Sequence, residues 1–264
     1  MRTKEYNHPP IDCPEEDIAL LKERYHALFS DEVSKIAIEK FRLLEVIGKG
    51  GFGIVFKAFS TVQNKHVALK FIDPDITAQE DSYKRVIREI NNAQKIKDHR
   101  IVSIYAIEKW NGIVFLVMEY YEGKTFKDFL EEKPDLSWDK TKPLFIDILR
   151  AVKVLHDHHI IHRDLKPSNI FITNDNRIVL LDFGLSKKTD EHTATITRDK
   201  ILGTAAYLSP EQLSPQNKIG FGSDIYQMGT ILFFMIYRRL PFEGNTDSSI
   251  FQKLYGKPEF PGKN

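Results

Sequence analysis

The sequence is poor in cysteine, in long apolar runs and in excess charge of either sign. Its single cysteine, Cys13, excludes a disulfide within the chain and fits a reducing compartment, so we expect a cytoplasmic location. The most apolar run, Ile231–Tyr237, is far shorter than the roughly 20 residues of a membrane helix. It predicts a buried helix and no membrane segment. The first residues also lack the apolar core of a signal peptide.

Charge and composition indicate an ordinary globular protein. The chain has 38 Lys and Arg against 37 Asp and Glu, and the net charge of +1 gives no reason to expect a nucleic-acid partner. With 264 residues, of which 42% are hydrophobic, the chain can bury a substantial core in one large domain or two small lobes. No internal repeat and no low-complexity tract interrupts it.

Residues 1–40 differ from the rest of the chain. Three prolines mark an irregular start, and apolar residues then recur at helical spacing at Ile18, Leu21, Tyr25, Leu28 and Phe29. This pattern predicts an N-terminal extension with a short amphipathic helix. Docking of that helix on the main domain is the simpler interpretation, and binding of a partner is the alternative.

The remainder, 41–264, changes from strands to helices near residues 121–123. An N-terminal lobe over 41–121 contains the expected strands, and a C-terminal lobe over 122–264 contains most of the expected helices. The predicted strands are 41–47, 54–59, 66–72, 101–107 and 113–121, with an Asn111-Gly112 turn before the last. The predicted helices are 82–96, 139–158, 223–237 and 248–255. The fold class is therefore α+β.

Three glycines, Gly48, Gly50 and Gly53, follow the first predicted strand. Without Cβ atoms, such residues let a backbone approach phosphate groups closely. A dinucleotide-binding loop has the same spacing but leads from a strand into a helix. Here the next segment is again a strand, which predicts the tip of a hairpin folded over a nucleotide. An ordinary glycine-rich hairpin is the plain alternative.

Further motifs follow in order. They are IGKGGFGIV (47–55), VALK (67–70), REI (88–90), HRDLKPSN (162–169), DFG (182–184), GTAAYLSPE (203–211) and DIYQMG (224–229). Together they resemble the protein kinase superfamily over residues 41 to about 260. The resemblance implies a bilobal α+β fold with a β-rich N-lobe, one main N-lobe helix and a helical C-lobe. The stretch from Gly203 to Gln212 most resembles bacterial eukaryotic-like Ser/Thr kinases.

The resemblance implies ATP and Mg²⁺ as cofactors, with Mn²⁺ as an alternative metal, and phosphoryl transfer by positioning and charge compensation. Lys70 is expected to hold the α- and β-phosphates, with Glu89 as its ionic partner. Asp164 is the expected base for the substrate hydroxyl, and Lys166 would stabilise charge on the transferred group. Asn169 and Asp182 are the expected metal ligands, since magnesium prefers hard oxygen donors.

The same resemblance implies a nucleotide site built from the glycine loop, an apolar pocket and the connector between lobes. Val55, Ala68 and Phe171 would line the adenine, Met118 would stand behind it, and the backbone of Glu119 and Tyr121 would read its edge. The expected nucleotide-binding residues are Ile47, Gly48, Lys49, Gly50, Gly51, Phe52, Gly53, Ile54, Val55, Ala68, Lys70, Met118, Glu119, Tyr121 and Phe171.

Two features resemble kinases that act on serine or threonine. Lys166 follows Asp164-Leu165, and Thr204 occupies the place of a threonine that supports the catalytic pair. The segment Gly203–Glu211 favours a protein substrate over a metabolite, although a small-molecule kinase remains an alternative.

A regulatory phosphate is expected as well. In this family, an arginine before the catalytic aspartate, here Arg163, usually pairs with the phosphate of a phosphorylated activation loop. We therefore expect autophosphorylation at one or more of Thr193, Thr195 and Thr197, with homodimer formation to carry it out. A solvated threonine-rich loop is the plain alternative.

Three features depart from the expected pattern or invite another interpretation. Ser209 replaces the usual alanine. The chain ends at Asn264, so we expect a shortened C-lobe in which Glu211 lacks its usual arginine, unless another group satisfies it. That end keeps a second function open, a catalytically weak or inactive pseudokinase-like interaction module. His156, His158 and His159 suggest a metal site. A helix that ends just before the catalytic loop, the HRDLKPSN segment (162–169), explains them better without a metal.

Overall fold

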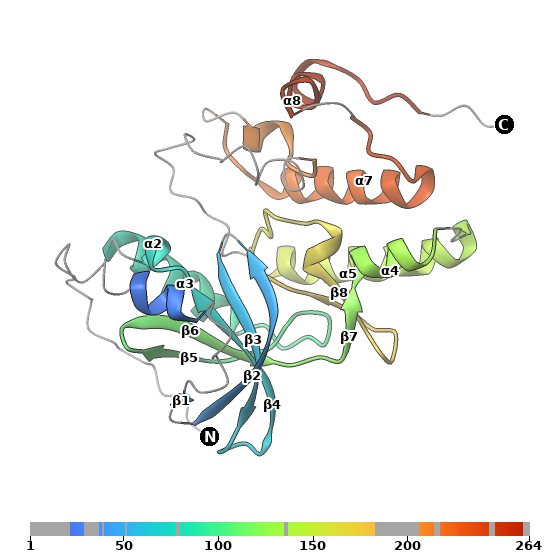
Figure 1. The fold of residues 1–264 in the computed structure, drawn as a ribbon. Helices are drawn as coiled ribbons and strands as arrows, with labels where there is room; N and C mark the ends of the chain where they lie inside the picture. Colours follow the sequence, from blue (N-terminus) through green and yellow to red (C-terminus); the bar gives the residue numbers. More distant parts are fainter. Residues whose placement is uncertain are drawn as a thin grey trace. The chain divides into compact units, whose positions relative to one another are not determined.

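The computed structural model describes residues 22–28, 37–38, 40–50, 52–77, 80–134, 137–182, 206–213, 217–242 and 246–260. The chain divides into two compact units, one made of residues 1–95 and 103–120, the other of residues 96–102 and 121–264. The first unit is built around a β-sheet and the second is mainly helical, which is the predicted α+β class (Figure 1). Within the described ranges, no helix has the length and apolarity needed to cross a membrane.

The first unit contains a six-stranded antiparallel sheet in the order β1-β2-β3-β4-β6-β5. Its strands twist strongly in Figure 1, as right-handed strand twist predicts. Their bounds are β1 Ala37–Ile38, β2 Phe41–Gly50, β3 Gly53–Ser60, β4 Lys65–Ile72, β5 Ile104–Trp110 and β6 Ile113–Glu119.

One face of this sheet carries an aromatic and aliphatic core. Side chains alternate between the two faces along a strand, so Phe56, Phe71 and Phe115 from three neighbouring strands meet on the same side. Phe71 stacks on Phe115 with ring centroids 4.9 Å apart, and Phe56 meets Phe71 edge to face. All three are fully or almost fully buried and belong to one hydrophobic cluster.

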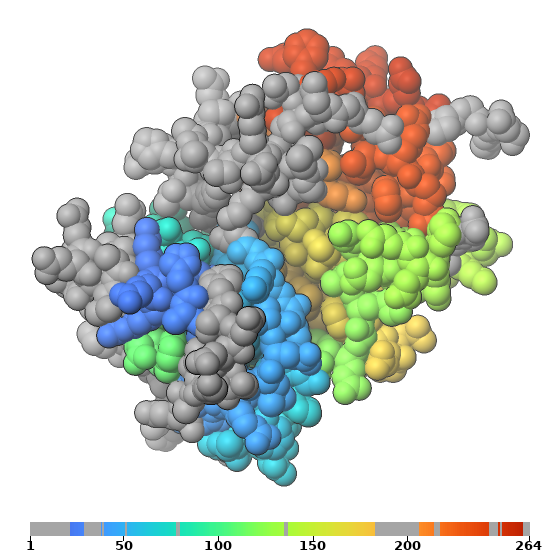
Figure 2. Space-filling view, viewed as in Figure 1, coloured from blue at the N-terminus to red at the C-terminus, as the bar shows by residue number. Residues whose placement is uncertain are grey.

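The N-terminal extension contributes to this core. Residues 22–27 are helical, and the helix places Tyr25 and Leu28 in the same buried cluster. Lys22 pairs with Asp75, and Arg24 donates to the carbonyl oxygen of Asn111 at 3.0 Å. Figure 2 shows this segment in blue against the first unit. The helix is thus an integral part of the hydrophobic core of the first unit.

Two helices complete the first unit, α2 (Pro74–Thr77) and α3 (Glu80–Ala93). The apolar stripe that predicted the second helix, which includes Val86 and Ile90, is buried as expected. The helix ends at Ala93, three residues earlier than the pattern indicated.

The hairpin between β5 and β6 follows its sequence signal. Asn111 and Gly112 have φ angles of 48° and 84°, the positive values that a two-residue hairpin turn requires. The predicted strand 101–107 was wrong at its start, because β5 begins only at Ile104. Ile101 instead forms an isolated bridge with Leu180 and belongs to the second unit.

The second unit begins with a short sheet that the sequence pattern did not predict. Its three antiparallel strands are β7 (Gly123–Thr125), β8 (Ile170–Thr173) and β9 (Ile178–Leu180). Strands this short carry too few residues for a recognisable alternation. Its helices are α4 (Phe126–Glu132), α5 (Trp138–Asp157), α7 (Phe221–Tyr237) and α8 (Thr246–Tyr255), with 3₁₀ turns η2 (Pro167–Asn169) and η3 (Pro210–Leu213).

The predicted helices of this unit are confirmed within about two residues at each end. The apolar run near the end of α7 is a buried helix face, since Ile231, Phe233 and Met235 are almost fully inaccessible. In Figure 1, α8 lies close to the η3 segment. Lys253 of α8 donates to the carbonyl oxygens of Ala206 and Leu208 at 2.7 and 3.2 Å, so this helix holds the segment just before η3.

Candidate active site

The three glycines lie on an antiparallel hairpin. Gly48 faces Val55 and Gly50 faces Gly53 in the β2–β3 register, so the loop joins strand to strand as predicted. Gly53 has a φ of 145°, and a Cβ there would lie 1.8 Å from the carbonyl oxygen of Phe71. A Cβ on Gly50 would meet no heavy atom within 4 Å. Gly53 is therefore needed for folding, while Gly50 is not required by any neighbouring atom of the fold. Gly51 lies outside the described residues.

Lys70 lies on the sheet face opposite the aromatic core. The strand register sets Val55 beside Lys70 and Ala68 beside Met118, and cross-strand neighbours share a face. The structure therefore brings these four predicted residues to one side of the sheet. Lys70 is only 2% exposed, and its Nζ lies 5.9 Å from the ring centroid of Phe52.

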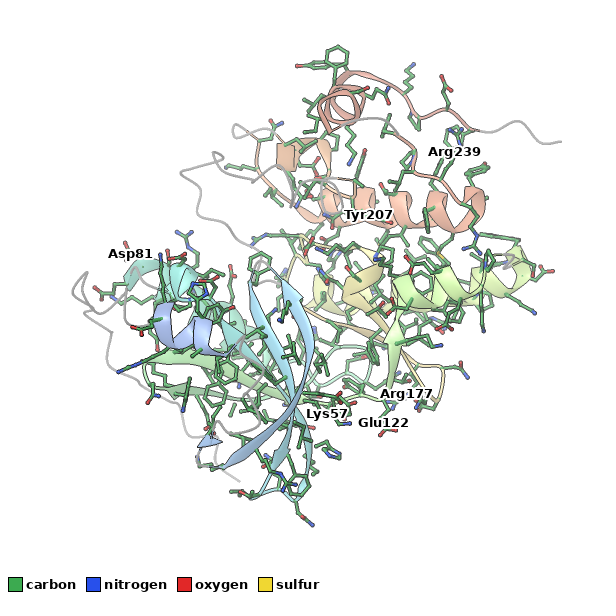
Figure 3. All side chains as sticks on the ribbon, viewed as in Figure 1. Lys57, Asp81, Glu122, Arg177, Tyr207 and Arg239 are labelled. Atoms are coloured by element: carbon green, nitrogen blue, oxygen red, sulfur yellow. The ribbon has the colours of Figure 1, made fainter. Side chains whose placement is uncertain are left out.

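Lys57 of β3 faces Ala68 in the register, so it lies on the same face as Lys70, and it is labelled in Figure 3. Its Nζ lies 4.9 Å from the ring centroid of Tyr120. Ile54 is different: its side chain is fully buried in the aromatic core, so only its backbone can serve a ligand on the Lys70 face.

The other predicted nucleotide and partner residues are spread over both units. Glu89 is half-buried on α3, next to the buried Ile90. Ile47 is 45% exposed on β2. Glu119 ends β6, and its N–H donates to the carbonyl oxygen of Ser103 at 2.9 Å. Tyr121 and Phe171 belong to the second unit, where Phe171 is half-buried on β8.

Asp164 is held at the centre of a loop between α5 and η2. Its Oδ2 accepts a hydrogen bond from Asn169 Nδ2 at 2.9 Å and pairs with Lys166 Nζ at 2.9 Å. Asn169 Nδ2 also donates to the backbone oxygen of Asp164 at 2.7 Å. Three residues that the sequence predicted to act together are thus in direct contact.

His162 supports this loop as a neutral imidazole. Its Nδ1 accepts from the N–H of Asp164 at 3.3 Å, so the proton is on Nε2, which donates to the carbonyl oxygen of Leu181 at 2.9 Å. The ring is completely buried, and this burial lowers the pKa of His162, with nearby carboxylates such as Asp224 opposing the shift. Both ring nitrogens of His162 therefore form hydrogen bonds while the imidazole is uncharged.

Asp224, near the start of α7, holds the backbone of the same loop through hydrogen bonds. It is fully buried, and its two oxygens accept the backbone N–H groups of His162 and Arg163, each at 2.8 Å. His156 Nε2 lies 2.8 Å from the same carboxylate. The histidine cluster in the sequence thus supplies a hydrogen-bond partner to Asp224, while His158 Nδ1 lies 2.8 Å from the carbonyl oxygen of Val154.

Asn169 and Asp182 offer oxygen ligands that fit a magnesium ion. The Leu181 N–H donates to the Asn169 carbonyl oxygen at 2.9 Å, which places Asp182 one residue from that contact. Because the Asn169 amide nitrogen is directed to Asp164, its side-chain oxygen is the atom left to face a cation. No set of three His, Cys, Asp or Glu residues among those described forms a closed metal cage.

Glu211 has a partner that the sequence did not reveal. The hydroxyl of Ser223, a buried residue of α7, donates to Glu211 Oε1. Among the alternatives that the sequence left open, the one in which another group bonds to Glu211 is correct. Nothing in the sequence around Ser223 indicates this contact, which arises because the fold brings η3 onto α7.

Two glutamines near the catalytic loop also escaped the sequence analysis. Gln227 follows Asp224 by one helical turn, and its Oε1 accepts the N–H of Leu165 at 2.8 Å. Gln212 of η3 donates to the carbonyl oxygen of Arg163 at 2.6 Å. The spacing of Gln227 from Asp224 was the available signal, because residues three apart share a helix face.

Comparison with known proteins decides the family. The family model described as Protein kinase domain matches residues 41–259. This chain belongs to the protein kinase domain family. The predicted superfamily resemblance is therefore confirmed.

Curated relatives of this kinase domain are Ser/Thr kinases of bacteria and also a kinase of yeast. A probable serine/threonine-protein kinase of Clostridium acetobutylicum is 34% identical over 221 residues, 84% of this chain and 33% of that protein. Serine/threonine-protein kinase PrkC of Bacillus subtilis is 34% identical over 81% of this chain and 33% of its own length. The carbon catabolite-derepressing protein kinase of Saccharomyces cerevisiae is 30% identical over 84% of this chain and 35% of its own. The chain thus spans about a third of the length of the relatives it matches.

Several residues with predicted roles in this kinase domain lie outside the described residues. They are Phe183 and Gly184 of the DFG motif, the threonines from Thr189 to Thr197, and Thr204.

Proposed function

We propose that this kinase domain transfers the γ-phosphoryl group of ATP to serine or threonine hydroxyls of protein substrates. The observation that carries the proposal is the Asp164 carboxylate, which Lys166 and Asn169 hold in one orientation through Oδ2. A fixed carboxylate next to a lysine is what alignment of a hydroxyl for in-line transfer needs.

Asp164 Oδ1 is the atom that we assign to the substrate hydroxyl. It would accept that hydrogen bond and take the proton as the hydroxyl oxygen bonds to the γ-phosphorus, while the bond to the β,γ-bridging oxygen breaks and ADP leaves. Lys166, whose side chain is 19% exposed, would remain near the transferred group and offset its charge. A positioned base of this kind typically contributes on the order of 10²–10⁴ in rate.

The first unit supplies the residues that we assign to the nucleotide. Lys70 would hold the α- and β-phosphates with Glu89 as its partner, and the backbone at Gly50 would approach the phosphates. Val55, Ala68 and Met118 share the Lys70 face and would line the adenine. Asn169 and Asp182 would hold Mg²⁺, which neutralises phosphate charge when it is bound.

Regulation belongs to the same proposal. Arg163 directly precedes Asp164, and we propose autophosphorylation at Thr193, Thr195 or Thr197 between two copies of the chain. A cytoplasmic location also stays a prediction, to be tested by fractionation of cells that express the protein. Phosphopeptide mapping after incubation with ATP and Mg²⁺ tests the autophosphorylation sites, and an unlabelled 189–197 peptide would contradict them.

Radiolabelled ATP and a generic basic protein test the activity directly. We expect the wild type to label the protein and Asp164→Ala and Lys70→Met to lose labelling by 10²-fold or more, on the order of the contribution of a positioned base. Phosphoamino acid analysis should find phosphoserine or phosphothreonine.

Three outcomes would contradict the proposal. Labelling that survives both substitutions would exclude the assigned roles of Asp164 and Lys70. A folded wild type that binds ATP without labelling any protein would favour the pseudokinase-like interaction module. Transfer to a metabolite alone would favour the small-molecule kinase.

A further inference from the structure

Gln227 and Gln212 form a pair of directly bonded side-chain amides beneath the catalytic loop. Gln227 is 1% exposed on α7, and Gln212 is half-buried in η3. Gln227 Nε2 donates to Gln212 Oε1 at 2.8 Å. Both amides also donate to one acceptor, the carbonyl oxygen of Arg163, at 3.0 Å from Gln227 and 2.6 Å from Gln212.

Backbone groups fix the orientation of each amide. The N–H of Leu165 can only donate, so Gln227 must turn its oxygen toward it, and the Arg163 carbonyl can only accept, so the nitrogen must face that side. For Gln212, the Ser209 N–H at 3.0 Å fixes the oxygen and the Arg163 carbonyl fixes the nitrogen. A carboxylate in either place would turn an oxygen toward an acceptor, so an uncharged amide is required.

The hydrogen-bonded pair of Gln212 and Gln227, here called the bridge, binds the peptide groups on both sides of Asp164. Arg163, the preceding residue, has a φ of 68°, a left-handed conformation that costs free energy outside glycine. Its N–H donates to Asp224, and its carbonyl accepts from both glutamines. The next N–H after Asp164, that of Leu165, donates to Gln227. The amide pair therefore holds the strained backbone that aims the Asp164 side chain.

The bridge is also hydrogen-bonded to Ser209, in the segment that precedes α7. Gln212 Oε1 accepts from the backbone N–H and the hydroxyl of Ser209, which is fully buried. Ser209 is the residue that replaces the usual alanine, and its hydroxyl adds a second donor at 3.1 Å. Residues 209–212 and the backbone around Asp164 thus share one hydrogen-bonded network.

We infer that Gln212 and Gln227 are positioning residues, which hold Asp164 in its working orientation and link that orientation to the conformation of residues 209–212. The inference rests on the proposed phosphoryl transfer for its catalytic part. Its structural part, the restraint of the backbone at residues 163–165, does not depend on activity.

Amide hydrogen exchange tests the structural part. In Gln227→Met and Gln212→Met, we expect the peptide that covers residues 162–166 to exchange about tenfold faster than in the wild type, because restraining hydrogen bonds of this size are lost. Gln252→Met, on an exposed part of α8, is the matched control and should leave that exchange unchanged. Unchanged exchange in both bridge variants would overturn the inference.

Steady-state kinetics test the catalytic part. We expect each substitution to lower kcat about 10- to 100-fold with little change in KM for ATP, since the nucleotide residues are not altered. The double variant should lose less than the product of the two single losses, because both glutamines bind the Arg163 carbonyl oxygen and each other. Losses that simply multiply, or a loss confined to KM, would overturn the coupling.

The two proposals fail in distinguishable ways. A wild type without phosphoryl transfer would overturn the proposed function, whereas the exchange of residues 162–166 decides the bridge by itself. If Gln227→Met does not fold, Gln212→Met carries the test, because it leaves Gln227 bonded to Leu165.

Discussion

Arg163 and Asp182 adopt a left-handed backbone conformation without being glycine. Arg163 and Asp182 have φ angles of 68° and 54°, and each is next to, or is itself, a residue with a proposed role in transfer. Such conformations persist where surrounding contacts over-determine them. At Arg163 those contacts are the Asp224 carboxylate and the two glutamine amides. The precision of the site is thus supplied by residues that need not touch a substrate.

Gly53→Ala tests the steric requirement of the glycine hairpin. Its Cβ would lie 1.8 Å from the carbonyl oxygen of Phe71 at a φ of 145°, so β3 and β4 must separate. We expect the free energy of unfolding to fall by at least about 1–3 kcal/mol, as for other strained backbone positions. Thermal and urea unfolding measure it.

Gly50→Ala is the matched control, because a Cβ there meets nothing within 4 Å. It should keep the stability of the wild type within about 0.5 kcal/mol. Equal stability of the two variants would contradict the assignment of Gly53 to folding.

His162 predicts a pH dependence of stability. Burial lowers its pKa below the ordinary value of about 6.5, so the unfolded chain binds a proton at a pH where the folded chain does not. Stability is therefore fully present above about pH 6.5 and falls as the pH drops below it, by at most about 1.4 kcal/mol per pH unit for one group.

We expect His162→Gln to show a shallower fall of unfolding free energy between about pH 5 and 6.5. His99→Gln is the control, since the side chain of His99 is 63% exposed. An unchanged slope in His162→Gln would show that this imidazole titrates freely in the folded protein.

At the scale of elements, the N-terminal helix is part of the sheet core of the first unit. Leu28 is fully buried in the cluster that contains Phe41 and Phe115, and Tyr25 is 4% exposed there. Burial raises the pKa of the Tyr25 hydroxyl, as expected for a phenol that loses its hydration. The helix therefore stabilises the sheet.

Leu28→Ala should destabilise the first unit by about 2–5 kcal/mol, the usual range for truncating a buried leucine. Glu23→Ala, on the exposed side of the same helix, controls for helix propensity and should change stability little. Calorimetry of both variants measures the difference. A loss of equal size in both would mean that the helix contributes through its charge and not through its apolar face.

At the scale of the whole molecule, each unit carries its own part of the proposed chemistry. The first contains the glycine hairpin and Lys70, and the second contains Asp164, Asn169 and Asp182. A ligand that binds only the folded chain stabilises it by mass action. If the metal helps to hold the nucleotide, removal of the metal should reduce that stabilisation.

We expect ATP with Mg²⁺ at a hundred times its dissociation constant to raise the free energy of unfolding by about 2.7 kcal/mol. Chelation of the metal by EDTA should remove most of that gain, and Asp182→Asn should reduce it. Differential scanning fluorimetry measures the shift in Tm. A full shift with EDTA present would exclude a role of the metal in holding the nucleotide.

Much of the fold followed from local patterns. Alternating apolar residues predicted β3, β4 and β6, and the stripes at helical spacing predicted α3, α5 and α7, because burial of one face imposes that periodicity. The short strands of the second sheet were missed, since three or four residues carry no period. The start of β5 was predicted wrongly because Ile101, although apolar, forms an isolated bridge with Leu180 and is not part of β5.

The sequence by itself determined the family and the residues that carry the proposed chemistry, because charged and polar groups at fixed motif positions are visible without a fold. The tertiary structure alone decided what holds them. Asp224, Gln212 and Gln227 lie far along the chain from Asp164, and their hydrogen bonds to the loop around it depend on tertiary packing. Partners of Glu211 and Leu28 were hidden for the same reason. Local sequence patterns determine most of the helices and strands, whereas tertiary packing determines the contacts that hold the site.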